Sequence, residues 1–266
     1  MLQIKPLAIS ATFIALATTL LAASPERRVL VYTKNQTGTN EAGKKLYVHD
    51  NLAASVAAIK KLGAENDFIV DASDDPSVFT SSNLKRYKAL IFSNTNNEIF
   101  DNEEQKAAFR EYIRGGGGFV AIHSASGSMR QWPWFWEVLG GKFERHAKLQ
   151  AFTVIVKDPS DPSTAHFPKT FEWTDEFYFC GHMPEGLHVL LAGDLAKLDD
   201  PDKKKSAGKY TDEFPLAWRH QFDGGREWYT SLGHQKEHYS DPLFTKHLLG
   251  GILWAMGQEP KSKKVE

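Results

Sequence analysis

From Arg28 onward, short runs of apolar and often β-branched residues alternate with amphipathic helical patterns, and this alternation decides the fold class. A short apolar run bounded by polar or glycine residues indicates a strand that is buried on both faces. Helical patterns between such runs indicate crossover connections, which join parallel strands. We therefore expect an α/β fold with a mainly parallel central sheet and helices on both faces. The expected buried strands cover residues 29–32, 68–70, 89–92 and 119–122.

Three helices have recognisable starts or ends. The first is expected over residues 46–62, where apolar residues recur at helical spacing before Gly63. The second begins at residues 100–104, where a hydrophobic staple residue, an N-cap and an acid at the third helical position follow in order, and the glycines at 115–118 end it. A capping aspartate and a helix-starting proline precede the closing helix, which is expected over residues 243–256.

The second half of the chain is less regular. We expect strands at 152–156 and 189–191, and a hairpin around the turn Asp223-Gly224-Gly225. Between Lys197 and Glu213, ten of seventeen residues are charged, which marks a surface excursion and not a domain boundary. The chain therefore reads as a single domain over residues 28–257.

The amino-terminal residues 1–23 have the pattern of a secretory signal peptide. Lys5 supplies a positive charge, residues 7–21 are mostly apolar and carry no charged side chain, and small residues follow. The apolar run is shorter than the roughly 20 residues that a spanning helix needs. We expect export to the periplasm or the outside of the cell, with no stable membrane insertion once the signal is removed. An uncleaved membrane anchor is the alternative. Residues 258–266 are expected to be a tail.

Composition excludes several classes of function. Of 266 residues, 41% are hydrophobic, so the chain has enough apolar side chains to form a sizeable core. Lys plus Arg number 32 and Asp plus Glu 33, so there is no global positive charge for a nucleic acid. The single cysteine can form neither an intramolecular disulfide nor a Cys-rich zinc site. Composition leaves a homo-oligomer open.

His123 and Ser124 directly follow the fourth expected strand. In an open parallel sheet, ligands bind at the carboxyl ends of the strands, so both residues should face a binding crevice. The turn resembles the elbow that displays a nucleophile in hydrolases, but the usual spacing around a serine or cysteine is absent. An imidazole there can act as a base, a proton shuttle or a metal ligand. The alternative is a packed histidine that only bonds the loop backbone.

Several blocks of sequence support a family resemblance in combination. They are GGGFVAIHSA at 116–125, WPWF at 132–135, LGGKF at 139–143, TDEFY at 174–178, PLAW at 215–218, YTSLGH at 229–234 and YSDP at 239–242. Together they resemble the ThuA-like family, named for trehalose utilisation, over about residues 28–257. Any one block alone would be a weak signal.

The resemblance implies a flavodoxin-like three-layer α/β sandwich, similar to class I glutamine amidotransferases. His123 stands where those enzymes have a cysteine nucleophile, and Cys180 lies far along the chain, so glutamine hydrolysis is not expected. The family resemblance also implies carbohydrate metabolism, including sugars oxidised to the 3-keto form. A keto group acidifies the neighbouring C–H, so a histidine and a carboxylate could take that proton and protonate a leaving oxygen. His123 is our candidate base and Glu176 the candidate acid or second base.

The segment 172–178 contains acidic and aromatic residues that suit a sugar, because rings stack on its apolar face while carboxylates bind its hydroxyls. Asp175 and Glu176 would point in opposite directions on an extended chain, and we favour Glu176 inside, with Tyr178 on the same side. The alternative is a buried aromatic strand edge with exposed acids. The residues expected to bind substrate are Ser124, Trp132, His146, Asp175, Tyr178 and His234.

The histidines leave the cofactor open. His146 and His234 are expected to return over the crevice, and His220 lies on the other strand of the hairpin. With His123 and Glu176 they could hold a divalent metal ion, since imidazole suits zinc, manganese or iron, but no closely spaced ligand pair supports this. The remaining histidines receive no role.

Trp132, Trp134 and Trp136 crowd one segment, so at least one of them should border the site or a partner surface. A core or dimer contact is the alternative for Trp132. The leading interpretation of the chain is an exported enzyme acting on a sugar or 3-keto-glycoside by hydrolysis, elimination or isomerisation. The alternatives are a sugar-binding module without catalysis and a structural or interaction protein whose pocket is closed.

Overall fold

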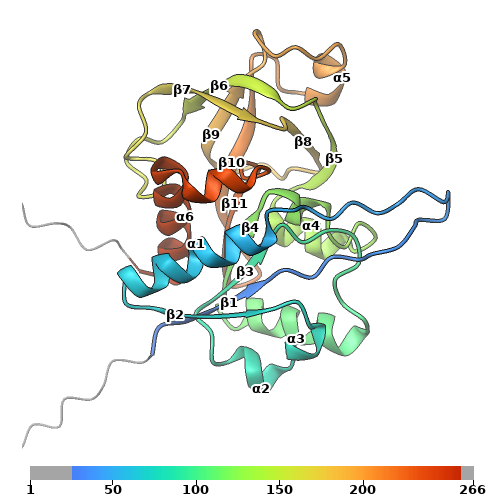
Figure 1. Cartoon of the computed structure of the whole chain (residues 1–266), viewed down its shortest axis with the longest axis vertical. Helices are drawn as coiled ribbons and strands as arrows, with labels where there is room; N and C mark the ends of the chain where they lie inside the picture. The colour runs from blue at the N-terminus through green and yellow to red at the C-terminus, as the bar shows by residue number, and fades with distance from the viewer. Residues whose placement is uncertain (1–25, 259–266) are drawn as a thin grey trace, which may run out of the picture.

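The computed structural model describes residues 26–258. The expected signal peptide at 1–23 and all but the first residue of the expected tail lie outside this range. Within it, no helix is both long enough and apolar enough to cross a membrane. Figure 1 shows the described chain as a central sheet with helices on either side.

A nine-stranded mixed sheet forms the middle layer, in the order β2-β1-β3-β4-β11-β10-β9-β6-β7. The first five strands in this order run parallel and the remaining neighbours pair antiparallel. The sheet therefore has a parallel half, as expected, and an antiparallel half, of which the sequence predicted the hairpin and two strands but not the pairing. The strands are β1 (Arg28–Tyr32), β2 (Ile69–Ser73), β3 (Ala89–Ser93), β4 (Gly118–Ile122), β6 (Gln150–Val156), β7 (Thr170–Asp175), β9 (His188–Asp194), β10 (Glu213–Phe222) and β11 (Gly225–Thr230).

Helices cover both faces of the parallel half (Figure 1). They are α1 (Leu52–Glu65), α2 (Ser81–Leu84), α3 (Glu103–Arg114), α4 (Pro133–Leu139) and α6 (Pro242–Ala255), and α5 (Lys203–Ala207) lies in the charged excursion. Three short 3-10 helices complete the elements: η1 (Pro76–Val78), η2 (His123–Gly127) and η3 (Lys236–Ser240). Residues of α1 and α6 pack in one apolar cluster and those of α3 and α4 in another. The expected α/β sandwich is confirmed.

The strands of the parallel half alternate their side chains between these two clusters. In β1, Val29 and Val31 belong to the cluster of α1 and α6, whereas Leu30 and Tyr32 belong to the cluster of α3 and α4. This is the period of two that a strand imposes. Since both faces are covered by helices, every position can be apolar, which explains the uninterrupted apolar runs in the sequence.

The hairpin expected around Asp223 joins the two halves of the sheet. β10 pairs antiparallel with β11, and β11 pairs parallel with β4. The chain turns at Asp223 and Gly224, which both have positive φ. A separate two-stranded sheet of β5 (Lys142–His146) and β8 (Tyr178–Gly181) lies beside the antiparallel half. Through it, two segments that are distant in sequence come to lie beside the carboxyl end of β4.

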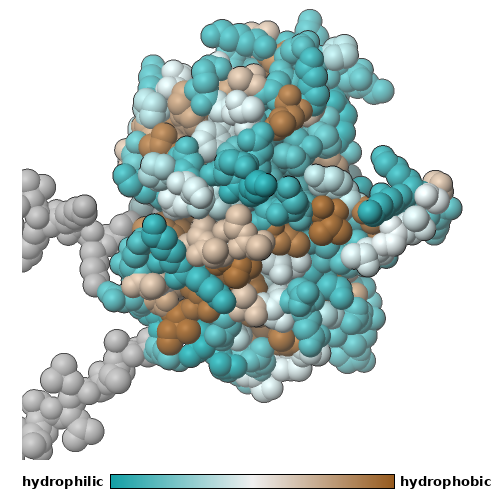
Figure 2. Space-filling view, in the orientation of Figure 1, coloured by the Kyte–Doolittle hydropathy of each residue, from teal (hydrophilic) through white to brown (hydrophobic). Residues whose placement is uncertain are grey.

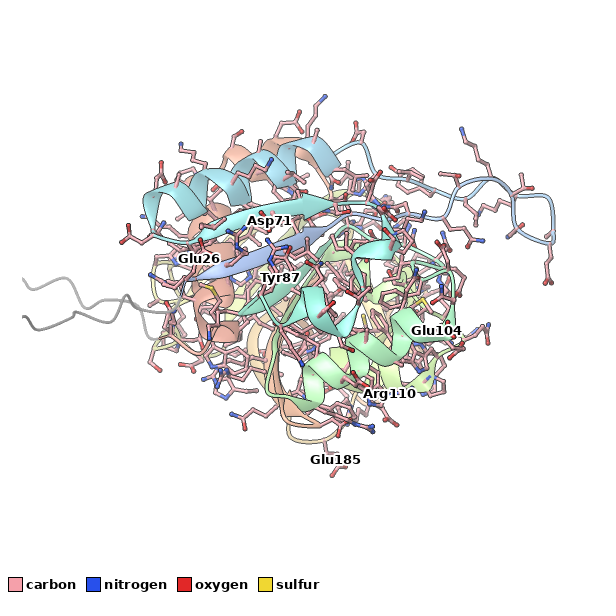
Figure 3. The ribbon with its side chains drawn as sticks, turned by 90° about the horizontal axis from the view of Figure 1, so that it is seen from below. Glu26, Asp71, Tyr87, Glu104, Arg110 and Glu185 are labelled. Carbon is pink, nitrogen blue, oxygen red and sulfur yellow. The ribbon has the colours of Figure 1, made fainter. Side chains whose placement is uncertain are left out.

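The strand expected at residues 68–70 is not buried on both faces. It begins one residue later, as β2, and pairs only with β1, so it is an edge strand of the sheet. Ile69 is 39% exposed. An ion pair and a hydrogen bond occupy this edge: Arg28 binds the Asp71 carboxylate, and the Tyr87 hydroxyl donates to it. Figure 3 shows Asp71 and Tyr87 near each other at this edge.

The first helix begins at Leu52, six residues later than the pattern predicted, and residues 46–51 are not helical. Asn51 stands at the N-cap, but its side chain does not cap the helix. Its amide instead donates to the carbonyls of Gly233 and His234 and to Asn94. These tertiary bonds hold the segment in a non-helical path, against the local preference. The preceding loop projects from the body of the molecule (Figure 1) and has a mostly hydrophilic surface (Figure 2).

Candidate active site

His123 lies where β4 ends and η2 begins, at the carboxyl edge of the parallel strands. Its φ is 52°, in the left-handed region that non-glycine residues seldom adopt. The ring is fully buried, with Nδ1 2.6 Å from the carbonyl oxygen of Ser231. A carbonyl can only accept, so Nδ1 carries the proton and Nε2 presents a lone pair. The hydroxyl of Tyr178 lies 2.9 Å from that Nε2.

His234 approaches the same nitrogen from the loop after β11. Its Nδ1 is 3.3 Å from Nε2 of His123. The backbone that carries it is fixed from two sides: Asn51 donates to the His234 carbonyl, and the amide of Gly233 donates to Asp175. β11 and β4 are adjacent parallel strands, so their carboxyl ends, and the residues that follow them, meet at one edge.

His49 completes the group from the segment before α1. It is buried, and its ring packs edge-on against those of His123 and His234, at centroid distances of 4.8 and 5.2 Å. Its Nδ1 lies 3.2 Å from the Ser124 hydroxyl, and its Nε2 has no hydrogen-bond partner among the described residues. Burial and the neighbouring imidazoles lower the pKa of His49 to about 2, so the ring stays neutral.

Sequence reasoning missed His49 because it placed this residue inside a helix. The signal that could have found it is the one that found His123. His49 lies in the loop that follows the first parallel strand, β1, and such loops collect at the ligand-binding edge.

Glu176 lies in the turn between β7 and β8, and its carboxylate faces His123, His234 and His146. Its Oε2 is 3.6 Å from Nε2 of His123 and 3.4 Å from Nδ1 of His234. Its Oε1 faces Nδ1 of His146, 3.5 Å away. Burial opposes ionisation of this carboxyl, but the facing imidazoles outweigh it and lower its pKa. Glu176 is therefore a carboxylate at neutral pH.

A cavity of about 600 Å³ opens beside Glu176. This volume lies within the range of small-molecule sites. Its wall includes Tyr47, His49, Ser124, His146, Glu176 and Tyr178. Its rim carries the cationic side chains of Lys44, Lys45 and Arg130. The cavity thus combines aromatic rings, a carboxylate, imidazoles and cationic side chains.

The family model for ThuA, described as trehalose utilisation, matches residues 28–255. This chain belongs to the ThuA family. The resemblance inferred from the sequence blocks is thereby confirmed. The comparison with curated proteins found no match.

Solved structures of ThuA-like proteins share the fold of this ThuA-family chain. One from Bacteroides uniformis is 23% identical, with a TM-score of 0.64 over 93% of this chain and 95% of that one. One from Parabacteroides merdae is 21% identical, with a TM-score of 0.63 over 89% and 94%. A β-galactosidase from Bacillus circulans is 13% identical, with a TM-score of 0.52 over 90% of this chain but 32% of that one. At these identities the likeness concerns the fold alone.

The residues that the sequence singled out do not all meet in this ThuA-family site. Ser124, His146, Glu176 and Tyr178 line the cavity, whereas His123 and His234 are not part of its wall. The solvent-accessible imidazole that the sequence predicted at the rim is therefore not observed, because the ring of His123 is 0% exposed. A ligand in the cavity would meet Glu176 before His123.

Asp175 lies beneath the site and not in it. Its carboxylate is fully buried and accepts hydrogen bonds from the amides of Glu176 and Gly233 and from the indole of Trp173. The segment is extended here, so Asp175 and Glu176 do point apart, with Glu176 toward the cavity. Asp175 thus ties the loop of Glu176 to that of His234 and positions both.

Trp132 and His220 lie away from the cavity. Trp132 packs against Phe100 and Phe135 in the aromatic cluster under α3 and α4, so the core contact that the sequence left as the alternative is what the structure shows. His220 lies 2.9 Å from the Val138 carbonyl and lines a different cavity. Cys180 is buried, and burial raises its pKa to about 12, so it remains a thiol.

Proposed function

We propose that this chain is an exported carbohydrate-active enzyme of the ThuA type that acts on a sugar glycoside carrying a keto group. The observation that supports it best is the carboxylate of Glu176 in the wall of a cavity, with three imidazole nitrogens 3.4 to 3.6 Å from its oxygens. Such a constellation can take a proton and return one, which a module that only binds sugar does not need.

The reaction begins at the C–H next to the keto group. Glu176 takes this proton, and the electron pair moves into an enolate whose oxygen carries the developing charge. In an elimination, the enolate then expels the glycosidic oxygen, which takes a proton from an acid in the site. His146 is placed for that role, because it is 42% exposed and lies 3.5 Å from Glu176. Hydrolysis or isomerisation would share the first step.

The burial of His123 changes the role that we assign to it. The sequence suggested it as the base, but its Nδ1 is held by the Ser231 carbonyl and its Nε2 is covered by the Tyr178 hydroxyl. It acts on Glu176 in this proposal and does not touch the sugar. Tyr47 and Phe143, on the cavity wall, offer rings for stacking, and the Lys44 and Lys45 amines can bind hydroxyl or carbonyl oxygens.

The test is turnover of a panel of 3-keto-glycosides beside their unoxidised counterparts, with product detection by chromatography. We expect product from the keto compounds alone, and a loss of kcat of about 100-fold or more in Glu176→Gln, in line with the contribution of general acid–base catalysis. Glu172→Gln is the matched control, because Glu172 is exposed on the preceding strand and, among the described residues, accepts a hydrogen bond from Thr153 alone. Binding without product would indicate the sugar-binding module instead.

Export is the second part of the proposal and rests on the signal pattern of residues 1–23. Expression of the full chain with a carboxyl-terminal tag, followed by fractionation of the cells, tests it. We expect a shortened product in the periplasm or the medium. A full-length product that stays in the cytoplasm would contradict export.

A further inference from the structure

We propose that His49, His123, His234 and Glu176 form a binding site for one divalent transition-metal ion. These four residues each offer one ligand atom, and the four atoms lie within 4.8 Å of one another. As a statement about catalysis the inference rests on the proposed function, since it concerns the same site. As a statement about binding it is independent of any substrate.

The spacing of the ligand atoms matches an ion better than it matches direct hydrogen bonds. His123 Nε2, His234 Nδ1 and Glu176 Oε2 form a triangle with sides of 3.3, 3.4 and 3.6 Å. Ligands at about 2.0 to 2.2 Å from a tetrahedral ion are roughly 3.3 to 3.6 Å apart. The three atoms therefore form one face of such a tetrahedron, whereas charge-assisted hydrogen bonds to a carboxylate are typically shorter, about 2.7 to 2.9 Å.

The fourth ligand is a buried nitrogen without a partner. Nε2 of His49 makes no hydrogen bond among the described residues, although the residue is only 4% exposed. A buried polar atom left unpaired costs free energy, which an ion bound to it would offset. The rings of His123 and His234 both lie within 5.2 Å of this imidazole, so its free nitrogen belongs to the same group.

The ring of His123 is held in the tautomer that metal binding requires, and a hydroxyl contacts the ring of His49. The Ser231 carbonyl holds Nδ1 of His123, which leaves Nε2 unprotonated, and the Ser124 hydroxyl contacts Nδ1 of His49. Metal-binding histidines commonly use their second ring nitrogen in this way, and the partner fixes the ring. The Tyr178 hydroxyl lies at Nε2 of His123, and its O–H bond would rotate away from this nitrogen when an ion takes the lone pair.

The donor set selects the kind of ion. Three imidazoles and one carboxylate suit zinc, manganese or iron, whereas calcium and magnesium prefer oxygen ligands alone. Four side chains fill a tetrahedral site, so the ion would have to expand to five ligands to polarise a keto or hydroxyl oxygen of the sugar and stabilise the enolate charge. Oε2 of Glu176 faces the other ligands and Oε1 faces His146, so one oxygen can bind the ion while the other faces the acid.

A second group, of Asp158, Asp161 and His188, has similar spacing but is already engaged. Asp161 pairs with Arg219, and Asp158 pairs with His188. This group therefore serves as the internal control, because replacing its histidine should not change the affinity of the chain for zinc.

The experiment uses the full chain without a histidine tag, stripped with a chelator and titrated with Zn²⁺ alone. Stoichiometry is read by elemental analysis after gel filtration, and affinity by competition with a chromophoric chelator. We expect one zinc per chain and a higher melting temperature. His49→Gln and Glu176→Gln should each weaken binding by more than the roughly 10- to 100-fold that loss of an outer-shell partner costs. His188→Gln should bind like the wild type.

Two results would overturn the inference: no zinc retained by the reloaded wild type, or equal affinity in the wild type, His49→Gln and Glu176→Gln. Circular dichroism of each variant establishes that it is folded, and the wild-type stoichiometry needs no variant. Zinc binding without turnover of any keto-glycoside would leave the metal site standing and contradict the proposed function. Turnover by protein that binds no ion would do the reverse.

Discussion

Replacing Asp175 with asparagine should destabilise the folded chain by about 2 to 4 kcal/mol, because one shared acceptor holds two loops of the site. In the wild type, Oδ1 accepts from the Glu176 amide at 2.8 Å, and Oδ2 accepts from the Gly233 amide at 2.8 Å and from the Trp173 indole at 3.0 Å. An asparagine side chain has the same shape but only one acceptor oxygen.

The best placement of that amide keeps its oxygen at the Oδ2 position. The Glu176 amide then faces an NH₂ group, which loses a hydrogen bond to a charged group worth about 1.5 to 3 kcal/mol. The other two bonds change from charged to neutral acceptors, at about 0.5 kcal/mol each. Relief of the buried charge offsets part of this loss and sets the lower end of the range.

Urea denaturation followed by circular dichroism measures the difference. Glu172→Gln on the same strand is the control, and it should change the free energy of unfolding by about 0.5 kcal/mol or less, as for other surface substitutions. If Asp175→Asn unfolds at the same urea concentration as Glu172→Gln, the carboxylate does not hold the two loops and the reasoning fails. If it is destabilised as expected, zinc affinity should fall with it, because Glu176 and His234 lose a common support.

Two further predictions concern the sheet. Burial raises the pKa of Glu227 well above its ordinary value of 4.5, so the folded chain keeps a proton that the unfolded chain loses. Stability should therefore be highest near and below that ordinary value and fall as pH rises, and Glu227→Gln should remove this fall; parallel slopes of the two proteins in urea melts from about pH 5 to about pH 8 would contradict it. Gly118→Ala should destabilise by about 1 to 3 kcal/mol, because the added Cβ would lie 2.2 Å from the backbone oxygen of Ala255. Gly115→Ala, whose Cβ would meet nothing closer than 3.3 Å, should melt within a few degrees of the wild type, and equal losses in both would refute the steric argument.

The strands of the parallel half were predictable because helices cover them on both faces. The apolar runs at residues 29–32, 89–92 and 119–122 lie in β1, β3 and β4, and all of their residues are buried, so local composition and tertiary position agree. The apolar run at residues 68–70 gave a wrong prediction of burial. An edge strand can carry the same apolar residues as a central strand, although solvent reaches part of it. The predicted start of α1 was wrong for another reason. Residues 46–51 have helical spacing of apolar residues, but the hydrogen bonds of Asn51 to a loop about 180 residues away hold them in a non-helical path.

Within the candidate site, the sequence located residues at strand ends and could not locate their partners. His123 and His234 follow strands that are neighbours in the sheet, so the rule for parallel sheets placed them at one edge. Glu176 was proposed from the composition of the segment 172–178 and from the family resemblance. Its contact with His123 depends on how β7 and β8 fold back over that edge. Trp132 shows the limit of this reasoning, because a tryptophan suits a core and a sugar site equally well.

The chain's own residue order determined the α/β class, the hairpin, the closing helix and the edge where chemistry would gather, because periodicity and turn residues act over a few positions. Only the tertiary structure decided that His49 joins the group, that His123 is buried behind Glu176, and that the ligand atoms stand at the spacing of a metal site. These depend on angles and distances between segments far apart along the chain. No local pattern carries that information, since it arises only when the sheet, its added antiparallel strands and the loops pack together.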